Sequence, residues 1–156
     1  MSTNPEVYAG TCLCGSVKVK VVGQPVGAGL CHCDSCRTWH AAPINAWAIW
    51  QGDAVTVTQG EDLLEAYDTG TSMRHWCRQC GTGVLNRKPN GMTVVYAMVL
   101  AESSYVHQPS CHIYYEETVF DIQDGLPKYV DLPTEWGGSG KTIDEPSKTG
   151  MHSSTD

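Results

Sequence analysis

The sequence lacks any apolar run close to the roughly 20 residues that a membrane-spanning helix requires, and it has no stretch of sustained helical periodicity. Its first ten residues carry neither a basic start nor an apolar core, so no secretory signal is visible. Basic residues are scarce, because 10 Lys and Arg face 17 Asp and Glu and give a net charge of −7. This balance argues against nucleic acid and anionic lipid as partners. We therefore expect a cytoplasmic protein that binds neither nucleic acid nor membranes.

Short, strand-like segments dominate the chain and predict a mainly β fold. Val17, Val19 and Val21 alternate with lysines, which is typical of a strand with one buried face. We expect residues 63–67 to form a strand or a turn, residues 23–29 a loop, and residues 37–40 a single helical turn. Further strands are predicted over residues 44–50, 54–58, 91–100, 112–115 and 118–120.

The length of 156 residues suits one domain with a modest core. We place this domain at residues 8–132. Residues 134–156 contain glycine, serine, threonine and charged residues but almost nothing apolar, and such a segment cannot offset its own ordering entropy. We expect a disordered C-terminal tail there.

The sequence contains eight cysteines. In a reducing compartment they are better explained as metal ligands than as disulfides. Cys31, Cys33 and Cys36 lie within six residues, so a tight turn lets their sulfurs converge on one soft cation at the roughly 2.3 Å of a zinc–sulfur bond. This stretch predicts a metal-binding loop.

Two further cysteine pairs are each followed by a glycine, which can take a positive φ and turn backbone N–H groups toward the sulfurs. Because the two knuckles are alike, we expect them to share one closed structural zinc. A metal that closes so long a loop can contribute several kcal/mol to the stability of a small domain. The ligands of this site are Cys12, Cys14, Cys77 and Cys80.

The triplet of cysteines leaves the fourth corner of a tetrahedral ion undecided. If this corner is open, the zinc is catalytic, whereas a fourth protein ligand would make it structural. Cys111 could close the site, and so could four histidines, His32, His40, His75 and His112. The residue types and their spacing leave both alternatives standing.

The ordered cysteine motifs resemble one known family. The residues that carry this resemblance are Cys12-x-Cys14-Gly15, then Cys31-His32-Cys33-x-x-Cys36-Arg37, then Trp76-Cys77-x-x-Cys80-Gly81, and the Pro109-x-x-His112-Ile113 element. In this respect the chain is similar to the glutathione-dependent formaldehyde-activating enzymes, which share a domain with centromere protein V.

The resemblance implies a small Mss4-like β-sheet domain with two zinc ions per chain. It assigns a structural zinc to the two glycine-backed pairs and a second zinc, with an open position, to Cys31, Cys33 and Cys36. The implied reaction joins formaldehyde to glutathione as S-(hydroxymethyl)glutathione, which is carbon–sulfur lyase chemistry in reverse. The implied partners are a small thiol and a small aldehyde.

Basic and imidazole side chains near the cysteines suggest further roles in this chemistry. His40 or His75 is a candidate proton shuttle, and Arg37, Arg74 or Arg78 is a candidate partner for substrate carboxylates. We place Arg37 and His40 in the candidate catalytic site with the triplet. Two rival hypotheses are a zinc enzyme for another carbonyl or imine substrate, independent of glutathione, and a non-catalytic interaction module with both zinc sites closed.

Overall fold

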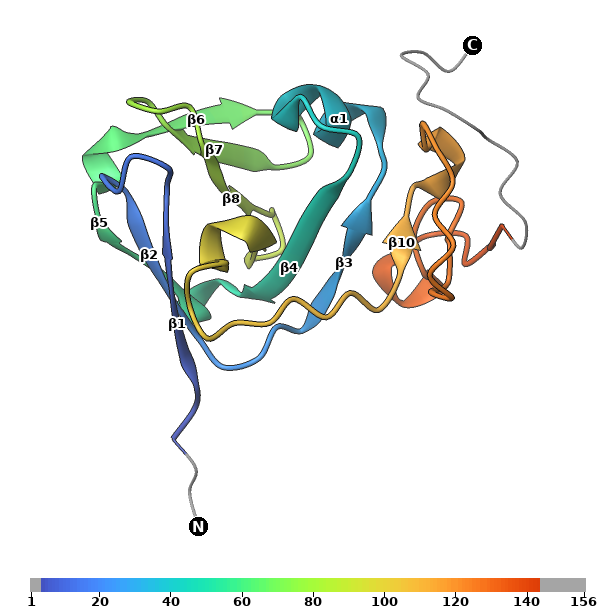
Figure 1. The fold of residues 1–156 in the computed structure, drawn as a ribbon, viewed down its shortest axis with the longest axis horizontal. Coiled ribbons are helices and arrows are strands. Elements are labelled where there is room, and N and C mark those ends of the chain that lie inside the picture. The colour runs from blue at the N-terminus through green and yellow to red at the C-terminus, as the bar shows by residue number, and fades with distance from the viewer. Residues whose placement is uncertain (1–3, 144–156) are drawn as a thin grey trace. The chain divides into compact units, whose positions relative to one another are not determined.

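The computed structural model describes residues 4–143 (Figure 1), so residues 144–156 of the predicted tail lie outside the described part. The described residues form mainly strands, as predicted, and they divide into two compact units. Unit 1 comprises residues 4–27 and Trp47–His107, and unit 2 comprises Ala28–Ala46 and residues 108–143. One zinc-binding domain over residues 8–132 stays a prediction.

The first sheet of unit 1 contains β1 (Val7–Thr11), β2 (Lys18–Val22) and β5 (Val55–Gln59). The strands are antiparallel in the order β1-β2-β5. Val19 and Val21 of β2 are at most 1% exposed, while Lys18 and Lys20 face solvent. The predicted alternation is confirmed here, because one face of the sheet lies against the core.

Further strands of unit 1 run antiparallel in the order β4 (Asn45–Gln51), β9 (Met92–Tyr96), β8 (Gly83–Arg87), β7 (Met73–Cys77) and β6 (Leu64–Asp68). Two short 3₁₀ helices, η1 (Gly52–Ala54) and η2 (Glu61–Leu63), lead into β5 and β6. Trp47 and Trp50 of β4 are buried, as expected for large aromatics. The strands β1, β7 and β8 were not predicted from the sequence.

The predicted strand over residues 91–100 ends early, at Tyr96. The chain continues as a 3₁₀ helix, η3 (Ala97–Leu100), whose Val99 and Leu100 are buried. Gly10 of β1 makes room for this helix, since a Cβ there would lie 2.8 Å from Leu100 Cδ2. Apolar composition alone does not distinguish a buried strand from a buried helical turn.

In unit 2, β3 (Gly27–Cys31) pairs in parallel with β10 (His112–Ile113). Residues 27–29 were predicted to belong to a loop, and that prediction is wrong because Leu30 N–H donates to Cys111 O at 3.0 Å and extends the ladder. The helix α1 (Asp34–His40) follows β3 and contains the predicted helical turn.

The chain after β10 forms two more short helices, η4 (Tyr115–Glu117) and η5 (Thr134–Trp136). Residues 118–120 are not the predicted strand, because the hydroxyl of Thr118 donates to Phe120 O at 2.7 Å and holds the chain in a turn. Residues 134–143 are the described part of the predicted tail. There, Ile143 N–H donates to Lys128 O and Ser139 Oγ donates to Asp131 Oδ1 at 2.7 Å, so local polar contacts replace an apolar core.

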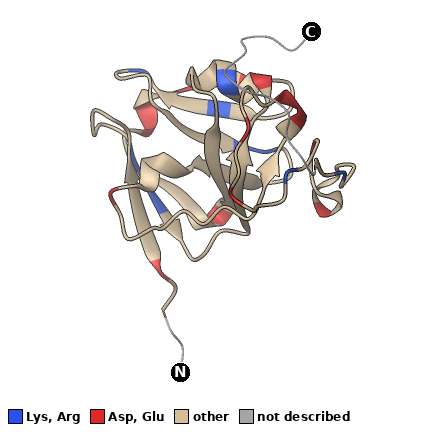
Figure 2. Cartoon of the chain, turned by 45° about the vertical axis from the view of Figure 1, so that its right-hand side comes forward, with Lys and Arg blue, Asp and Glu red and all other residues tan. Residues whose placement is uncertain are grey.

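The few basic residues of this acidic chain are dispersed over the described elements. Figure 2 shows the basic residues at separate places on the cartoon, without a run of them on one element. Within the described residues, no helix is both long enough and apolar enough to cross a membrane.

Candidate metal centres

Four thiols of unit 1 converge on one point. Cys12 and Cys14 lie in the turn between β1 and β2, Cys77 ends β7, and Cys80 follows in the next turn. Their Sγ atoms all lie within 4.8 Å of one another. The structure therefore brings together the two knuckles that were predicted to share a metal, and a zinc ion there stays a prediction.

The two knuckles share one backbone geometry. Gly15 and Gly81 both have a φ of 78°, and each donates its N–H to the carbonyl of the cysteine three or four residues earlier. Only glycine takes this left-handed conformation without strain. Val17 N–H then donates to Cys12 Sγ at 3.2 Å, which is the sulfur contact that the glycine was expected to allow.

Burial and hydrogen bonds give two thiols of this group, Cys77 and Cys80, very different pKa values. Burial raises the pKa of Cys77 to about 11. Burial also opposes ionisation of Cys80, but hydrogen bonds from Thr82 and Cys14 lower the pKa of that thiol to about 6. The hydroxyl of Thr82 lies 3.2 Å from Cys80 Sγ and accepts the Leu13 N–H of the other knuckle, so it joins the two turns.

The second group contains the three thiols of the predicted metal-binding loop. Cys31 ends β3, Cys33 is the N-cap of α1, and Cys36 lies in the first turn of α1. Their Sγ atoms lie within 4.8 Å of one another, and Cys36 N–H donates to Cys33 Sγ at 3.3 Å. The neighbouring thiols Cys33 and Cys36, and then burial, raise the pKa of Cys31 well above its ordinary value.

Both groups fit a tetrahedral thiolate-binding cation. Zinc–sulfur bonds of 2.3 Å place neighbouring sulfurs about 3.8 Å apart. The Sγ atoms of Cys12 and Cys14 are 3.6 Å apart, those of Cys14 and Cys77 3.9 Å, and those of Cys31 and Cys33 3.4 Å. These separations exceed the roughly 2.05 Å of a disulfide by far, and the eight cysteines are free. Each group can therefore hold a metal ion.

The predicted alternatives for a fourth ligand at the second group do not join it. Within residues 4–143, the group of ligand atoms within 4.8 Å contains only the three thiols. The ring of His32 is directed to Thr118 and His112, and His75 Nδ1 contacts Met73 O at 3.0 Å. Cys111 is buried in unit 2 and lies 3.9 Å from Ser110 Oγ. The donor set among the described residues thus has three members.

The basic residues that sequence reasoning singled out have different surroundings. Arg37 Nε donates to His32 O at 3.0 Å, and its Nη2 lies 3.6 Å from Asp34 Oδ1. Arg78 is exposed and pairs with Glu65 at 3.8 Å, while Arg74 is only 6% exposed on β7. His40, the last residue of α1, is half-buried. Arg37 thus contacts the metal-binding loop itself.

Sequence reasoning missed Tyr114, which follows β10. It has a φ of 52°, a left-handed conformation that is uncommon for a residue with a side chain. Burial, and then the negative charges of Cys31 and Cys33, raise the pKa of this phenol. Ionised thiols at Cys31 and Cys33 therefore disfavour ionisation of this phenol. No signal in the local sequence marks Tyr114.

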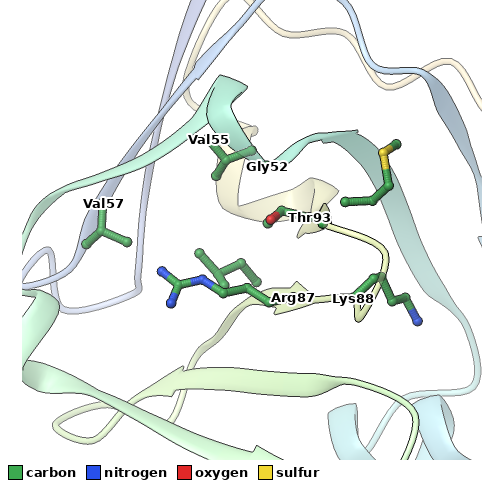
Figure 3. Close-up of a pocket in the computed structure, with 9 residues that line it drawn as sticks. Gly52, Val55, Val57, Arg87, Lys88 and Thr93 are labelled. Atoms are coloured by element: carbon green, nitrogen blue, oxygen red, sulfur yellow. The ribbon is translucent and has the colours of Figure 1, made fainter.

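Unit 1 also contains a hollow of about 340 Å³ at β5, β8 and β9 (Figure 3). Val55, Val57 and Leu85 form its apolar part, while Arg87, Lys88 and Thr93 contribute the polar atoms. No thiol, imidazole or carboxylate lines it. Among the described residues, the lining of this hollow thus includes none of the cysteines of the two thiol groups.

The chain is similar to two known proteins. An uncharacterized lyase of Schizosaccharomyces pombe is 30% identical over 87 residues, which are 56% of this chain and 61% of that protein. The chain thus matches about three fifths of that relative's length. A crystal structure of a Rhodobacter sphaeroides protein is 27% identical, with a TM-score of 0.48, and the match covers 60% of this chain and 88% of that one.

Residues 7–117 match the family described as "glutathione-dependent formaldehyde-activating enzyme". This range contains both groups of converging thiols and the His112-Ile113 strand. The chain therefore belongs to the glutathione-dependent formaldehyde-activating enzyme family.

Proposed function

We propose that the protein is a zinc-dependent enzyme of carbon–sulfur lyase type that joins a small aldehyde, formaldehyde, to glutathione or a similar thiol at Cys31, Cys33 and Cys36. The observation that carries this proposal is the group of three thiols found among residues 4–143, because three ligands leave one corner of a tetrahedral ion for substrate. Family membership and the lyase-named relative support the reaction class.

The reaction is a balanced addition. The thiol sulfur forms a bond to the carbonyl carbon, the π bond of the carbonyl breaks, and the thiol proton moves to the former carbonyl oxygen. Neither partner is oxidised or reduced. The protein must therefore hold the thiol as its thiolate and provide a path for one proton. When bound, zinc lowers the pKa of a thiol ligand and so supplies the thiolate form at neutral pH.

The residues of unit 2 have distinct roles in this proposal. Cys31, Cys33 and Cys36 would hold the zinc, and Arg37 positions their loop through its bond to the His32 carbonyl. His40 is the proposed carrier of the proton from sulfur to oxygen. Tyr114 is the proposed hydrogen-bond donor to the new hydroxyl oxygen, because burial and the charges of Cys31 and Cys33 raise the pKa of its phenol.

The test is glutathione binding followed by reaction. Calorimetric titration of the zinc-loaded protein should show one glutathione per chain, bound more tightly as the pH rises, because binding releases the thiol proton. NMR exchange measurements should then show faster interconversion of formaldehyde, glutathione and their adduct than in protein-free buffer. His40→Gln should slow this exchange about a hundredfold and leave glutathione affinity nearly unchanged.

Two cysteine variants serve as a matched pair. Cys33→Ser should abolish both binding and exchange, whereas Cys111→Ala should retain both, since Cys111 lies outside the thiol group. If glutathione does not bind to protein that carries two zinc ions, the proposed substrate is wrong. If it binds without faster exchange, the enzyme acts on a different carbonyl or imine.

A further inference from the structure

The hollow of unit 1 is lined by strands of two sheets. Val55 and Val57 belong to β5, whereas Leu85 and Arg87 belong to β8 and Thr93 belongs to β9. Its volume of about 340 Å³ falls in the range of small-molecule sites, which often lie in the mouth of a β structure. The hollow is therefore large enough for a small organic ligand.

The strand register explains which side chains of β8 and β9 reach the hollow. Arg87 pairs with Thr93, and Leu85 pairs with Val95. Because side chains alternate between the two faces of a strand, Leu85, Arg87 and Thr93 share one face. Leu85 is 1% exposed and Thr93 5% exposed, while Arg87 is exposed to solvent. This face therefore passes from a buried interior to a charged rim.

Two glycines of the lining let η1 and the turn between β8 and β9 approach each other closely. A Cβ on Gly52 would lie 2.4 Å from the Gly91 carbonyl oxygen, so no side chain fits between these two segments. The turn is held by its own hydrogen bonds, since Lys88 N–H donates to Met92 O at 2.8 Å and Gly91 N–H donates to Lys88 O at 3.1 Å. The backbone thus fixes this wall of the hollow.

The charged residues of the hollow are both cationic. Arg87 and Lys88 are two of only 10 Lys and Arg in a chain of net charge −7, and none of the nine lining residues is acidic. Within residues 4–143, neither forms an ion pair with a carboxylate, whereas Arg37, Arg78 and Lys128 each do. A guanidinium group without a protein carboxylate has its donors available for an anionic ligand.

The two cations lie at different ends of the hollow. Figure 3 shows the side chain of Arg87 extending toward the side of Val57, while Lys88 points to the opposite side. An anion bound by Arg87 would therefore have apolar neighbours. The half-buried Val55 and Val57 and the buried Leu85 offer an apolar surface to the rest of the same ligand.

We propose that this hollow is a second ligand site, which binds a small monocarboxylate with an apolar body. Arg87 donates hydrogen bonds to the carboxylate, because the planar guanidinium matches its two oxygens. The apolar body lies against Val55, Val57 and Leu85. The inference does not depend on the thiol–aldehyde reaction, since no lining residue belongs to either thiol group.

The first test compares three probes, hexanoate, 1-hexanol and acetate, by calorimetric titration of the zinc-loaded protein at neutral pH. Hexanoate should bind one site per chain with a Kd on the order of 1 mM or lower, as expected for a ligand of its size. 1-Hexanol lacks the charge and acetate lacks the apolar chain, so each should bind about 10- to 100-fold more weakly. Equal affinity for hexanoate and 1-hexanol would overturn the inference.

The second test compares Arg87→Gln with Lys20→Gln. Both variants remove one positive charge from an exposed residue of unit 1, but Lys20 lies on β2, outside the lining of the hollow. Arg87→Gln should weaken hexanoate binding about 10- to 100-fold and leave 1-hexanol binding unchanged, whereas Lys20→Gln should match wild type. Equal weakening in both variants would indicate general charge attraction and overturn the inference.

A zinc ion at the triplet could also hold a carboxylate, and Cys33→Ser separates the two sites. This variant should bind hexanoate like wild type, because Cys33 does not line the hollow. If Cys33→Ser loses hexanoate binding and Arg87→Gln retains it, the carboxylate is a metal ligand and the inference is overturned. Failure of glutathione to bind would instead overturn the proposed function alone. If Arg87→Gln does not fold, Val57→Phe, which fills the hollow, replaces it, and wild-type hexanoate affinity in that variant would equally overturn the inference.

Discussion

At the scale of single residues, the local sequence predicts the conformation of the knuckle glycines but not the contact between the histidines of unit 2. Gly15 and Gly81 occupy left-handed turns that a Cys-x-Cys-Gly or Cys-x-x-Cys-Gly motif predicts directly. His32 and His112 contact each other at 2.8 Å but are 80 residues apart, and no local motif predicts that contact. The backbone turn requires the glycines, whereas the contact between the histidines depends on how distant segments pack.

The backbone requirement at the knuckle predicts a small and well-defined loss of stability. Gly15 has a φ of 78° and no atom within 4 Å of an added Cβ, so Gly15→Ala should cost only the left-handed strain, about 1–2 kcal/mol. Gly60 has nearly the same φ, 72°, but its Cβ would lie 2.2 Å from the Ser16 carbonyl oxygen. Gly60→Ala should therefore cost on the order of 3 kcal/mol or more.

Urea denaturation of the two zinc-loaded variants beside wild type measures this difference. Because the backbone conformations match, the gap between the variants isolates the steric contact. Equal losses of unfolding free energy would show that the Ser16 carbonyl moves aside without cost.

At the scale of elements, α1 has only seven residues and depends on its N-terminal end. A helix this short is not stable by itself, because nucleation is costly. Two acceptors stabilise its start: Cys33 Sγ accepts Cys36 N–H at 3.3 Å, and Glu117 Oε2 accepts Asp34 N–H at 2.6 Å. The helix that contains Cys36 and His40 is thus fastened by a candidate metal ligand and by a residue from η4.

Glu117 should therefore contribute to the stability of this helix. Glu117→Ala removes a charged acceptor at a helix N-terminus and should lower the free energy of unfolding by about 1 kcal/mol. Glu117→Gln keeps an oxygen acceptor and should lose less. Urea melts and amide hydrogen exchange at Asp34 provide the two readouts, and unchanged exchange at Asp34 in Glu117→Ala would contradict the assignment.

At the scale of the whole molecule, the two thiol groups connect segments with very different separations along the sequence. The four-thiol group joins two turns of unit 1 that are more than 60 residues apart, since Cys14 and Cys77 are separated by 63 positions. The triplet spans six residues of unit 2 and mainly constrains its own loop. Metal at the first group restricts the unfolded chain far more than metal at the second.

This difference predicts unequal effects of two conservative substitutions. Cys12→Ser should abolish folding, because a structural zinc contributes on the order of 10 kcal/mol, which is comparable to the whole stability of a domain. Cys33→Ser should stay folded, lose one of two zinc ions and lower the melting temperature by no more than about 5 °C. Metal analysis and thermal melting test both expectations.

Chelation provides an independent control. An excess of a strong chelator should first remove one zinc without unfolding and then unfold the protein as the second leaves. Equal loss of stability in Cys12→Ser and Cys33→Ser would instead make the triplet a structural site as well.

The thiol groups could be predicted from the sequence because ligand spacing is a local property. Cysteines two or three positions apart in a turn must lie close together, and glycine after a knuckle signals the turn itself. Val17, Val19 and Val21 were likewise predictable, because alternation with lysine encodes a strand with one buried face.

Only the tertiary structure decided what surrounds these groups. β3 is a strand despite its glycines because β10 supplies hydrogen bonds from 82 positions away. The apolar run after Tyr96 forms a 3₁₀ helix, for which Gly10 leaves space. Glu117 contacts Asp34, and His32 contacts His112, through pairings that carry no sequence signal. Such contacts depend on distant segments that meet in space, so the local sequence specifies the thiols of each centre and the fold specifies their environment.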